Sequence, residues 1–102
     1  MKTRNIKTID VRANEWFDKV NGNSYFSMNI TVNYGLKDEK NIFVPIQYGY
    51  GDHYRHKAFE TIKKQLNCFK AIPENESYFR AYEKYKIIYR HSKRENCLKK
   101  EL

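Results

Sequence analysis

The sequence predicts an α+β fold in which a three-stranded antiparallel meander is followed by one or two helices, a short fourth strand and a basic C-terminal segment. Three observations lead to this class: strict apolar/polar alternation in the first half, apolar residues three or four apart in the second half, and an excess of Lys and Arg near the end. The length of 102 residues suits a single domain, 1–102, with one core.

The composition is that of a folded protein whose core is rich in aromatic rings. Hydrophobic residues make up 40% of the chain, and nine Tyr and six Phe supply most of the aromatic share, which argues against a disordered chain. No apolar run approaches the roughly 18 residues of a membrane span, and the first residues lack the apolar region of a secretory signal. We therefore expect a soluble, cytoplasmic protein without a membrane partner, with Cys68 and Cys97 as reduced thiols.

The clearest strand covers residues 24–34. Its apolar face is formed by Phe26, Met28, Ile30, Val32 and Tyr34. Asn21-Gly22 favours a type I′ hairpin turn, so a segment ending at Val20 should pair with this strand. Alternation from Ile9 to Ala13 favours a strand there, although the spacing of Ala13, Trp16, Phe17 and Val20 also suits a helix.

The third strand and the helices follow from the same kind of pattern. Alternation from Ile42 to Tyr48 predicts a strand, and Pro45 within it predicts an edge position or a bulge. Asp52 is a candidate N-cap for a helix over 53–69, and Pro73 precedes a second helix over 74–84. A short strand should follow near 86–90, although one helix could also run to 90. Residues 92–102 suit a short helix or a frayed tail.

The formal charge is +8, and it is concentrated in the second half of the chain. Residues 1–52 carry seven basic and six acidic side chains, whereas residues 53–102 carry thirteen and six. The basic run, which we predict to bind nucleic acid or another anionic partner, consists of Arg80, Lys84, Lys86, Arg90, Lys93, Arg94, Lys99 and Lys100. Only Glu83 and Glu95 lie between positions 80 and 100, so we expect little pairing within the chain and little effect of charge reversal on stability.

The sequence contains no phosphate-binding GxxxxGK[ST], no GxSxG and no HExxH motif, so we expect no enzyme activity and no cofactor. Asp52, His53 and His56 are the one group that could bind a metal or support a small hydrolase. The alternative is that both histidines are simply exposed at a helix start.

Two groups of tyrosines have different expected roles. Tyr48, Tyr50 and Tyr54 alternate with glycines and are predicted to anchor a protein partner or to stack on bases, unless the segment is only a connector. Tyr78, Tyr82, Tyr85 and Tyr89 have helical spacing, which favours a place in the core.

Three segments carry a resemblance to known proteins: residues 8–27, residues 44–53 with the sequence VPIQYGYGDH, and residues 93–102 with the sequence KRENCLKKEL. Together they resemble a family of small uncharacterised proteins of bacteriophages and mobile elements. The chain is similar to an anti-CRISPR protein directed at an effector that uses a guide RNA to target RNA. This resemblance implies action in the bacterial host cytoplasm, and it brings no catalytic residues.

Two functional hypotheses follow. The first is a non-enzymatic binding protein that occupies a ribonucleoprotein or a nuclease of host defence, through its protein or its guide RNA. The second is a free-standing RNA- or DNA-binding module, because Gly49-Tyr50-Gly51 ahead of Arg55 and Lys57 resembles the helix entry of double-stranded-RNA-binding domains. The sequence departs from those domains in lacking their first helix and in the register of Lys57-Ala58.

Overall fold

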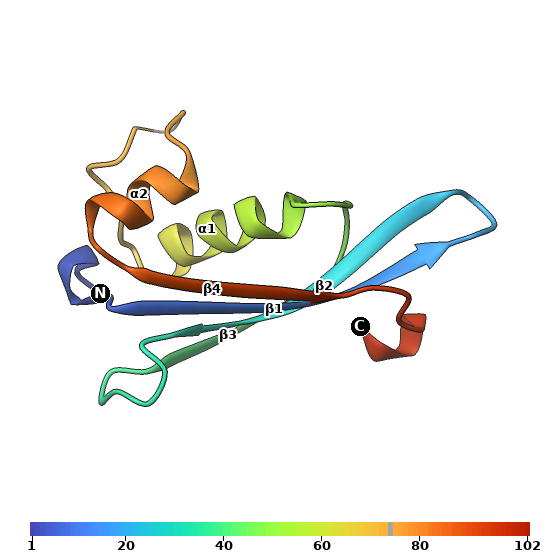
Figure 1. Ribbon diagram of the computed structural model, residues 1–102, viewed down its shortest axis with the longest axis horizontal. Helices are drawn as coiled ribbons and strands as arrows, with labels where there is room; N and C mark the ends of the chain where they lie inside the picture. The colour runs from blue at the N-terminus through green and yellow to red at the C-terminus, as the bar shows by residue number, and fades with distance from the viewer. Residues whose placement is uncertain (74) are drawn as a thin grey trace.

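The computed structural model describes residues 1–73 and 75–102, and it confirms the α+β class (Figure 1). The strands are β1 (Thr8–Asp18), β2 (Asn23–Val32), β3 (Lys40–Tyr48) and β4 (Ile88–Arg94), and the helices are α1 (His53–Gln65) and α2 (Tyr78–Lys84). Short 3-10 turns, η1 (Thr3–Asn5) and η2 (Lys99–Glu101), lie near the two ends. The strands form one sheet in the order β3-β2-β1-β4, and both helices lie on the same face of it (Figure 1).

β1 and β2 form the predicted hairpin, so the helical alternative for the first segment is wrong. The turn itself differs from the prediction. It takes residues 19–22 instead of two residues, and only Gly22 in it has a positive φ, 70°. The Asp18 carboxylate accepts hydrogen bonds from the backbone N–H groups of Val20 and Asn21 at 3.0 and 3.4 Å. This side-chain contact stabilises a wider turn in place of the type I′ geometry.

β3 is an edge strand and also carries an irregularity in its pairing with β2, so both consequences predicted for Pro45 occur. A bulge reverses the alternation of side chains beyond it. Ile46 and Tyr48 accordingly leave the core face and are 44% and 62% exposed. The predicted apolar face of this strand is therefore wrong beyond Val44.

The first helix is shorter than predicted. α1 ends at Gln65 instead of residue 69, because Asn67 and Phe69 have φ values of 51° and 58°, which are incompatible with a right-handed helix. Asp52 occupies the N-cap position as expected, but its side chain makes no capping hydrogen bond. Phe69 nevertheless reaches the core, where it is fully buried.

The second helix begins at Tyr78 instead of residue 74, because Ser77 has the extended conformation of an N-cap, with ψ 143°. Position 74, where we predicted its start, lies outside the described residues. Lys86, with φ 55°, then turns the chain into β4, which confirms a short strand and excludes one helix to residue 90. β4 runs parallel to β1, and both helices lie in the connection that leads from β3, at one edge of the sheet, to β4 at the other.

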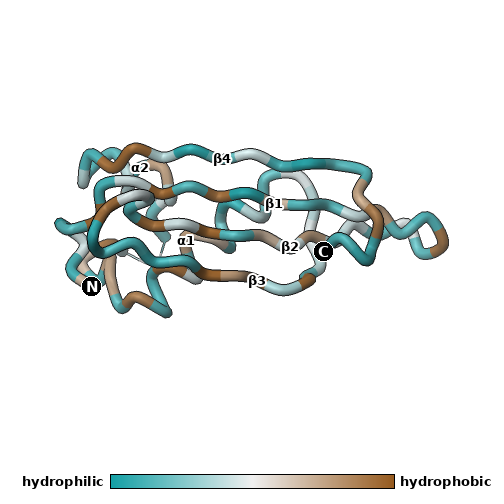
Figure 2. Tube along the Cα trace, turned by 90° about the horizontal axis from the view of Figure 1, so that it is seen from below, coloured by the Kyte–Doolittle hydropathy of each residue, from teal (hydrophilic) through white to brown (hydrophobic). Residues whose placement is uncertain are grey.

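The core lies between the sheet and the two helices. Tyr78 and Tyr82 are buried in it, and Tyr85 and Tyr89 pack against it half-buried, so the predicted core role of these tyrosines is confirmed. They come from α2, its C-terminal end and β4 instead of from one helix. Figure 2 shows the opposite side of the sheet, which we call the open face because neither α1 nor α2 covers it. The short turn η2 lies against this face, where Asn14 Nδ2 donates to the backbone oxygen of Glu101 at 3.4 Å. Among the described residues, no helix is long and apolar enough to cross a membrane.

Asn33 joins the end of β2 to the start of β1. It is completely buried, and its φ of 58° turns the chain out of the strand, so Tyr34 is 65% exposed instead of lying on the apolar face. Its Oδ1 accepts hydrogen bonds from the backbone N–H groups of Lys7 and Thr8, at 2.6 and 3.3 Å. Its Nδ2 donates to the backbone oxygen of Asn5 at 2.9 Å. One amide side chain therefore satisfies several backbone groups of the N-terminal segment.

We expect Asn33→Ala to lower the free energy of unfolding by about 3 kcal/mol, because it leaves buried backbone donors without an acceptor. Asn29→Ala is the matched control, since Asn29 is exposed on the neighbouring part of β2 and should change stability by less than about 0.5 kcal/mol. Urea denaturation of the two variants measures the difference. Equal destabilisation would contradict a central role for Asn33.

Candidate nucleic-acid interface

The fold separates the predicted basic run into three groups. Arg80, Lys84 and Lys86 lie on α2 or directly after it; Arg90, Lys93 and Arg94 lie on β4; and Lys99 and Lys100 lie on η2. Figure 1 shows α2 and η2 at opposite ends of the molecule. The run is therefore not one continuous surface, and each group has to be judged by its own surroundings.

The β4 group is paired within the chain, so the expectation of little internal pairing is wrong for it. Arg90 Nε lies 2.6 Å from Asp10 Oδ1, and Lys93 Nζ lies 3.3 Å from Glu15 Oε1. The register explains both contacts, because the parallel pairing of β4 with β1 brings together residues some 80 positions apart in the sequence. A count of charges between positions 80 and 100 could not include these partners.

The third member of the β4 group, Arg94, is neutralised in the same way. Arg94 pairs with Glu101 at 2.7 Å, and its Nε also contacts Cys97 Sγ at 3.3 Å. Cys97 and Cys68 are both free thiols, as predicted, and both are buried. Burial raises the pKa of the Cys68 thiol to about 11, so it is not a reactive thiolate at neutral pH.

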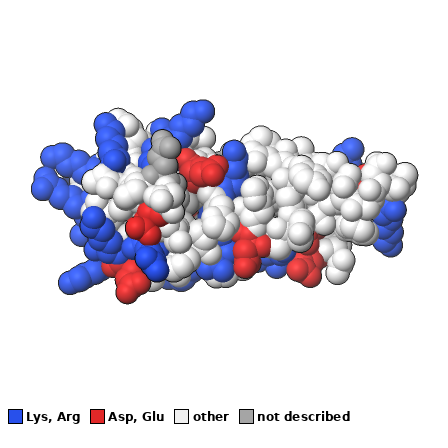
Figure 3. Space-filling model, turned by 90° about the horizontal axis from the view of Figure 1, so that it is seen from above, with Lys and Arg blue, Asp and Glu red and all other residues white. Residues whose placement is uncertain are grey.

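The α2 group contributes to a concentration of positive charge at one end of the molecule. Figure 3 shows Lys and Arg side chains gathered at the end where Figure 1 places α2 and the N-terminus. A hollow of about 540 Å³ opens there, and its charged lining residues are Lys2, Arg4 and Lys70, with Tyr85 beside them. Lys84 Nζ lies 5.9 Å from the centre of the Tyr85 ring. We call these five residues, with the space they surround, the basic hollow.

The basic hollow has the composition of an anion site. In the part of the chain that the structure describes, no carboxylate is among its lining residues, and its four cations are exposed. Among the described residues, none of these lysines nor Arg4 forms an ion pair, so they can reach phosphates without first breaking one. Tyr85 supplies an aromatic surface beside them, and its own ring is held edge-on by Phe69 at 5.9 Å. Sequence inspection missed Lys2, Arg4 and Lys70, because they lie far from the basic run in the chain.

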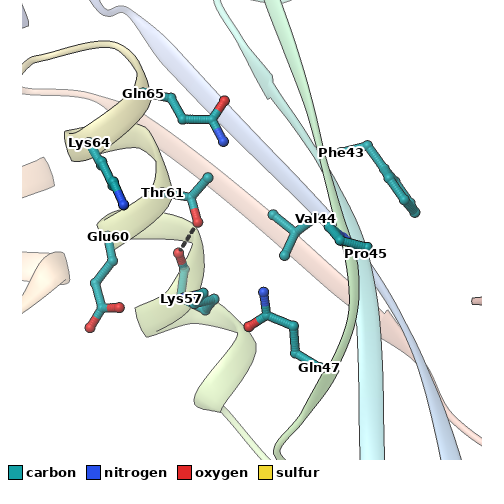
Figure 4. A pocket seen from close by; sticks show the side chains of 9 residues that line it. All are labelled: Phe43, Val44, Pro45, Gln47, Lys57, Glu60, Thr61, Lys64 and Gln65. Carbon is teal, nitrogen blue, oxygen red and sulfur yellow. Dashed lines mark hydrogen bonds between the residues drawn. The ribbon is translucent and has the colours of Figure 1, made fainter.

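A second hollow, of about 370 Å³, lies between α1 and β3 (Figure 4). Its side chains come from both elements: Phe43, Val44, Pro45, Gln47, Lys57, Glu60, Thr61, Lys64 and Gln65. The Thr61 hydroxyl donates to the Lys57 backbone oxygen at 2.7 Å and is therefore occupied locally (Figure 4). Glu60 stands between Lys57 and Lys64 along the helix, which makes this hollow less suited to a polyanion than the basic hollow.

The three tyrosines predicted as an anchor are not brought together. Tyr48 and Tyr50 are 62% and 74% exposed, but Tyr54 is buried and cannot contact a partner directly. It falls on the buried side of α1, and its hydroxyl is 2.8 Å from His91 Nδ1 on β4. Gly49, between Tyr48 and Tyr50, is required for packing, because a Cβ at this position would come within 2.7 Å of the His53 ring.

The histidines of the proposed metal group also pack against rings. His53 lies edge-on to Phe26 at 6.0 Å, and His56 lies edge-on to Tyr78 at 4.9 Å. In the part of the chain that the structure describes, no three His, Cys, Asp or Glu side chains are placed to hold a metal ion. The geometry therefore offers no support for the metal-dependent alternative built on Asp52.

Arg55 connects α1 to β4 through aromatic contacts. Its guanidinium carbon lies 5.0 Å from the Tyr78 ring and 5.5 Å from the Tyr89 ring, and its Nε donates to the Tyr89 hydroxyl at 3.4 Å. Burial raises the pKa of Tyr89 to about 12. The pKa of the neighbouring His91 is lowered, first by burial and then by the positive charge of Arg55. This cluster holds the helix against the edge strand.

The open face carries a row of aromatic side chains that the sequence analysis did not identify. Trp16 on β1 stacks on Tyr25 of β2 with ring centres 5.5 Å apart, and Tyr25 contacts Tyr48 of β3 edge-on at 5.8 Å. We call Trp16, Tyr25 and Tyr48 the aromatic row. The sequence did hold an indication of this row. Trp16 is seven residues from the buried Ile9 on the same strand, so its side chain must lie on the opposite face, and the antiparallel hairpin places a residue of β2 opposite Trp16.

The chain was compared with protein-family models, curated proteins and solved structures, and none of these matches it. The resemblance to phage proteins and the analogy with double-stranded-RNA-binding domains therefore gain no support from known relatives. The site has to be interpreted from its own geometry.

We expect Lys93→Glu to lower the free energy of unfolding by about 2 kcal/mol, because Lys93 and Glu15 are each only 14% exposed and would then repel each other. Lys100→Glu is the matched control, because Lys100 is exposed and should change stability by less than about 0.5 kcal/mol. Thermal and urea unfolding provide the measurement. Adding Glu15→Lys to Lys93→Glu should restore part of the loss, and no recovery would contradict the pairing.

The lowered pKa of His91 predicts a pH dependence of stability. The unfolded chain binds a proton more readily than the folded one, so the contribution is fully present above pH 6.5 and is lost as the pH falls through the folded pKa. His91→Gln should therefore lose less stability than the wild type between pH 7.5 and 5.5. Urea midpoints at the two pH values test this, and identical changes in both proteins would show that His91 does not titrate with folding.

Proposed function

We propose that the protein is a non-enzymatic binding protein that occupies RNA, most concretely the RNA of a ribonucleoprotein. The observation that carries this proposal is the basic hollow, where Lys2, Arg4, Lys70 and Lys84 surround Tyr85 and no carboxylate among the described residues lines the space. Cations arranged in this way neutralise phosphates and release their counterions, which is the main source of affinity for nucleic acids. The net charge of +8 adds long-range attraction to the same ligand.

The identity of the ribonucleoprotein rests on the resemblance to small phage and mobile-element proteins. Such a protein would act in the bacterial host cytoplasm by blocking an RNA-guided effector of host defence. Inhibition by occupancy requires only a stable, charged surface of sufficient size, and it needs no catalytic group. Tyr48 and Tyr50 are exposed and could add contacts to the protein part of such a complex.

A pull-down from host lysate, with and without ribonuclease, tests this proposal. Recovery of a ribonucleoprotein that is lost after ribonuclease treatment would support binding through RNA. Recovery that resists ribonuclease would place the contact on protein, as the exposed tyrosines would allow. Recovery of no ribonucleoprotein, combined with no binding to purified RNA near 0.1 M salt, would remove the proposal.

We expect Lys70→Glu combined with Lys84→Glu to weaken RNA binding strongly and to lower the slope of log K against log salt by about 1.4, since each single-strand phosphate contact contributes about 0.7. Lys37→Glu combined with Lys40→Glu is the control, because it changes the net charge equally at exposed positions in and beside the β2–β3 connection. Fluorescence anisotropy with labelled RNA at several salt concentrations measures both slopes. Equal losses in the two double variants would mean that net charge matters and the basic hollow does not.

A further inference from the structure

We propose that the aromatic row on the open face binds single-stranded nucleic acid by stacking its bases on Tyr48 and on the Trp16–Tyr25 pair. The proposal rests on the proposed function and names the form of nucleic acid that the protein takes. Its basis is a juxtaposition: three rings from neighbouring strands lie on the side of the sheet that α1 and α2 leave uncovered, next to the cations of Arg12 and Lys99.

The strand register builds the row. Trp16 lies directly opposite Tyr25, and Tyr25 lies directly opposite Tyr48, so the three rings cross three strands at one level of the sheet. The bulge beside Pro45 is necessary for this arrangement, because it reverses the alternation of β3 and places Tyr48 on the open face. The 62% exposure of Tyr48 leaves most of its ring available to a ligand.

The row is not a second core. Neither α1 nor α2 reaches this face (Figure 1), and the turn η2 contacts it through polar groups, with Asn14 donating to the Glu101 backbone oxygen. The next residue of β2 on the same face, Ser27, is buried but too small to fill a hydrophobic layer. Cross-strand aromatic pairs do stabilise hairpins, but three rings crossing the sheet also form the kind of surface on which unstacked bases are bound in single-strand-binding proteins. Each base presents a π face, so such binding does not need a sequence motif.

The charges of the open face are complementary to a phosphate backbone. Lys99 Nζ lies 5.4 Å from the centre of the Trp16 ring, which places a cation at one end of the row. Arg12 lies four residues before Trp16 on β1, so its side chain is on the same face, and it is exposed. Among the described residues, its guanidinium donates a hydrogen bond only to Thr31 Oγ1, at 3.2 Å. Since strand residues advance by about 3.3 Å each, Trp16 and Arg12 are roughly 13 Å apart along β1.

The carboxylates near this path are already satisfied. Asp10 is bound by Arg90 and Glu101 by Arg94, so the arginines of β4 remove the negative charges that would repel a phosphate. Asp18, at the hairpin end, accepts hydrogen bonds from the turn, and these lower its pKa. Asp18 therefore stays ionised at this end of the face, with Lys99 close enough to help lower its pKa. Arg12 and Lys99 are the cations that the face offers to a phosphate.

The sequence contains a single Trp, so the fluorescence of Trp16 reports on the row directly. We expect a 12-nucleotide oligouridine to quench this fluorescence on binding, whereas a 12-base-pair RNA duplex, whose bases are already stacked, should bind without comparable quenching. Tyr48→Ala should weaken oligouridine binding about tenfold and leave duplex binding unchanged. Tyr50→Ala is the matched control, because Tyr50 is even more exposed, at 74%, but lies outside the row.

The outcomes separate this inference from the proposed function. Binding of oligouridine without quenching, and with equal affinity in Tyr48→Ala, would overturn the role of the row while nucleic-acid binding stands. No binding of either RNA would overturn both. A dimer in sedimentation velocity that Tyr48→Ala dissolves would also overturn the inference, because the row would then be covered by a second copy of the chain. An unchanged thermal unfolding midpoint of Tyr48→Ala would show that the variant is folded. The quenching of Trp16 fluorescence is measured on the wild-type protein and therefore tests the row even if a variant does not fold.

Discussion

The constraint on which this structure depends is that two short helices can cover only part of one face of the sheet. α1 has 13 residues and is roughly 20 Å long, whereas β1 has 11 residues and extends over roughly 36 Å. The core therefore fills the region beneath the helices, and the end of the β1–β2 hairpin extends beyond it (Figure 1). The exposure of Phe17 and Val20, 47% and 92%, follows from this mismatch in length. The open face is covered by neither helix, so contacts between side chains of neighbouring strands must stabilise it.

The internal ion pairs of β4 are a consequence of the same constraint. Among the described strands, β4 is an edge strand that pairs only with β1. It is held by its backbone hydrogen bonds to β1 and by side chains that contact residues of β1. Lys93 reaches Glu15 on the helix-covered face and also donates to the Gly51 backbone oxygen at 3.1 Å, while Arg90 reaches Asp10 on the open face. These cations therefore stabilise the fold through internal ion pairs and are not free to bind a ligand. The charge that remains for a ligand lies at the α2 end and beside the aromatic row.

Local patterns predicted most of the fold, and long-range pairing decided what they missed. Alternation identified β1, β2 and β3 because one face of each is buried, and Pro45 correctly indicated an edge and a bulge. The helix ends were missed because Asn67 and Ser77 adopt conformations that periodicity does not report. The candidate site was predicted less well. The pairing of β4 with β1, the burial of Tyr54 and the alignment of Trp16 with Tyr25 all depend on register, which one sequence without its fold does not specify.

The unpaired cations and exposed rings contribute little to the stability of the fold. An excess of eight positive charges opposes a compact state through self-repulsion, and isolated exposed cations gain almost nothing from their surroundings. A bound polyanion removes that repulsion, and a base stacked on Tyr48 removes apolar ring surface from water. The basic hollow and the aromatic row lie toward opposite ends of a molecule 44 Å long, so two separate contacts can fix its orientation on one RNA. Under the proposed function, occupancy would then require only a small protein held on its ligand at two points.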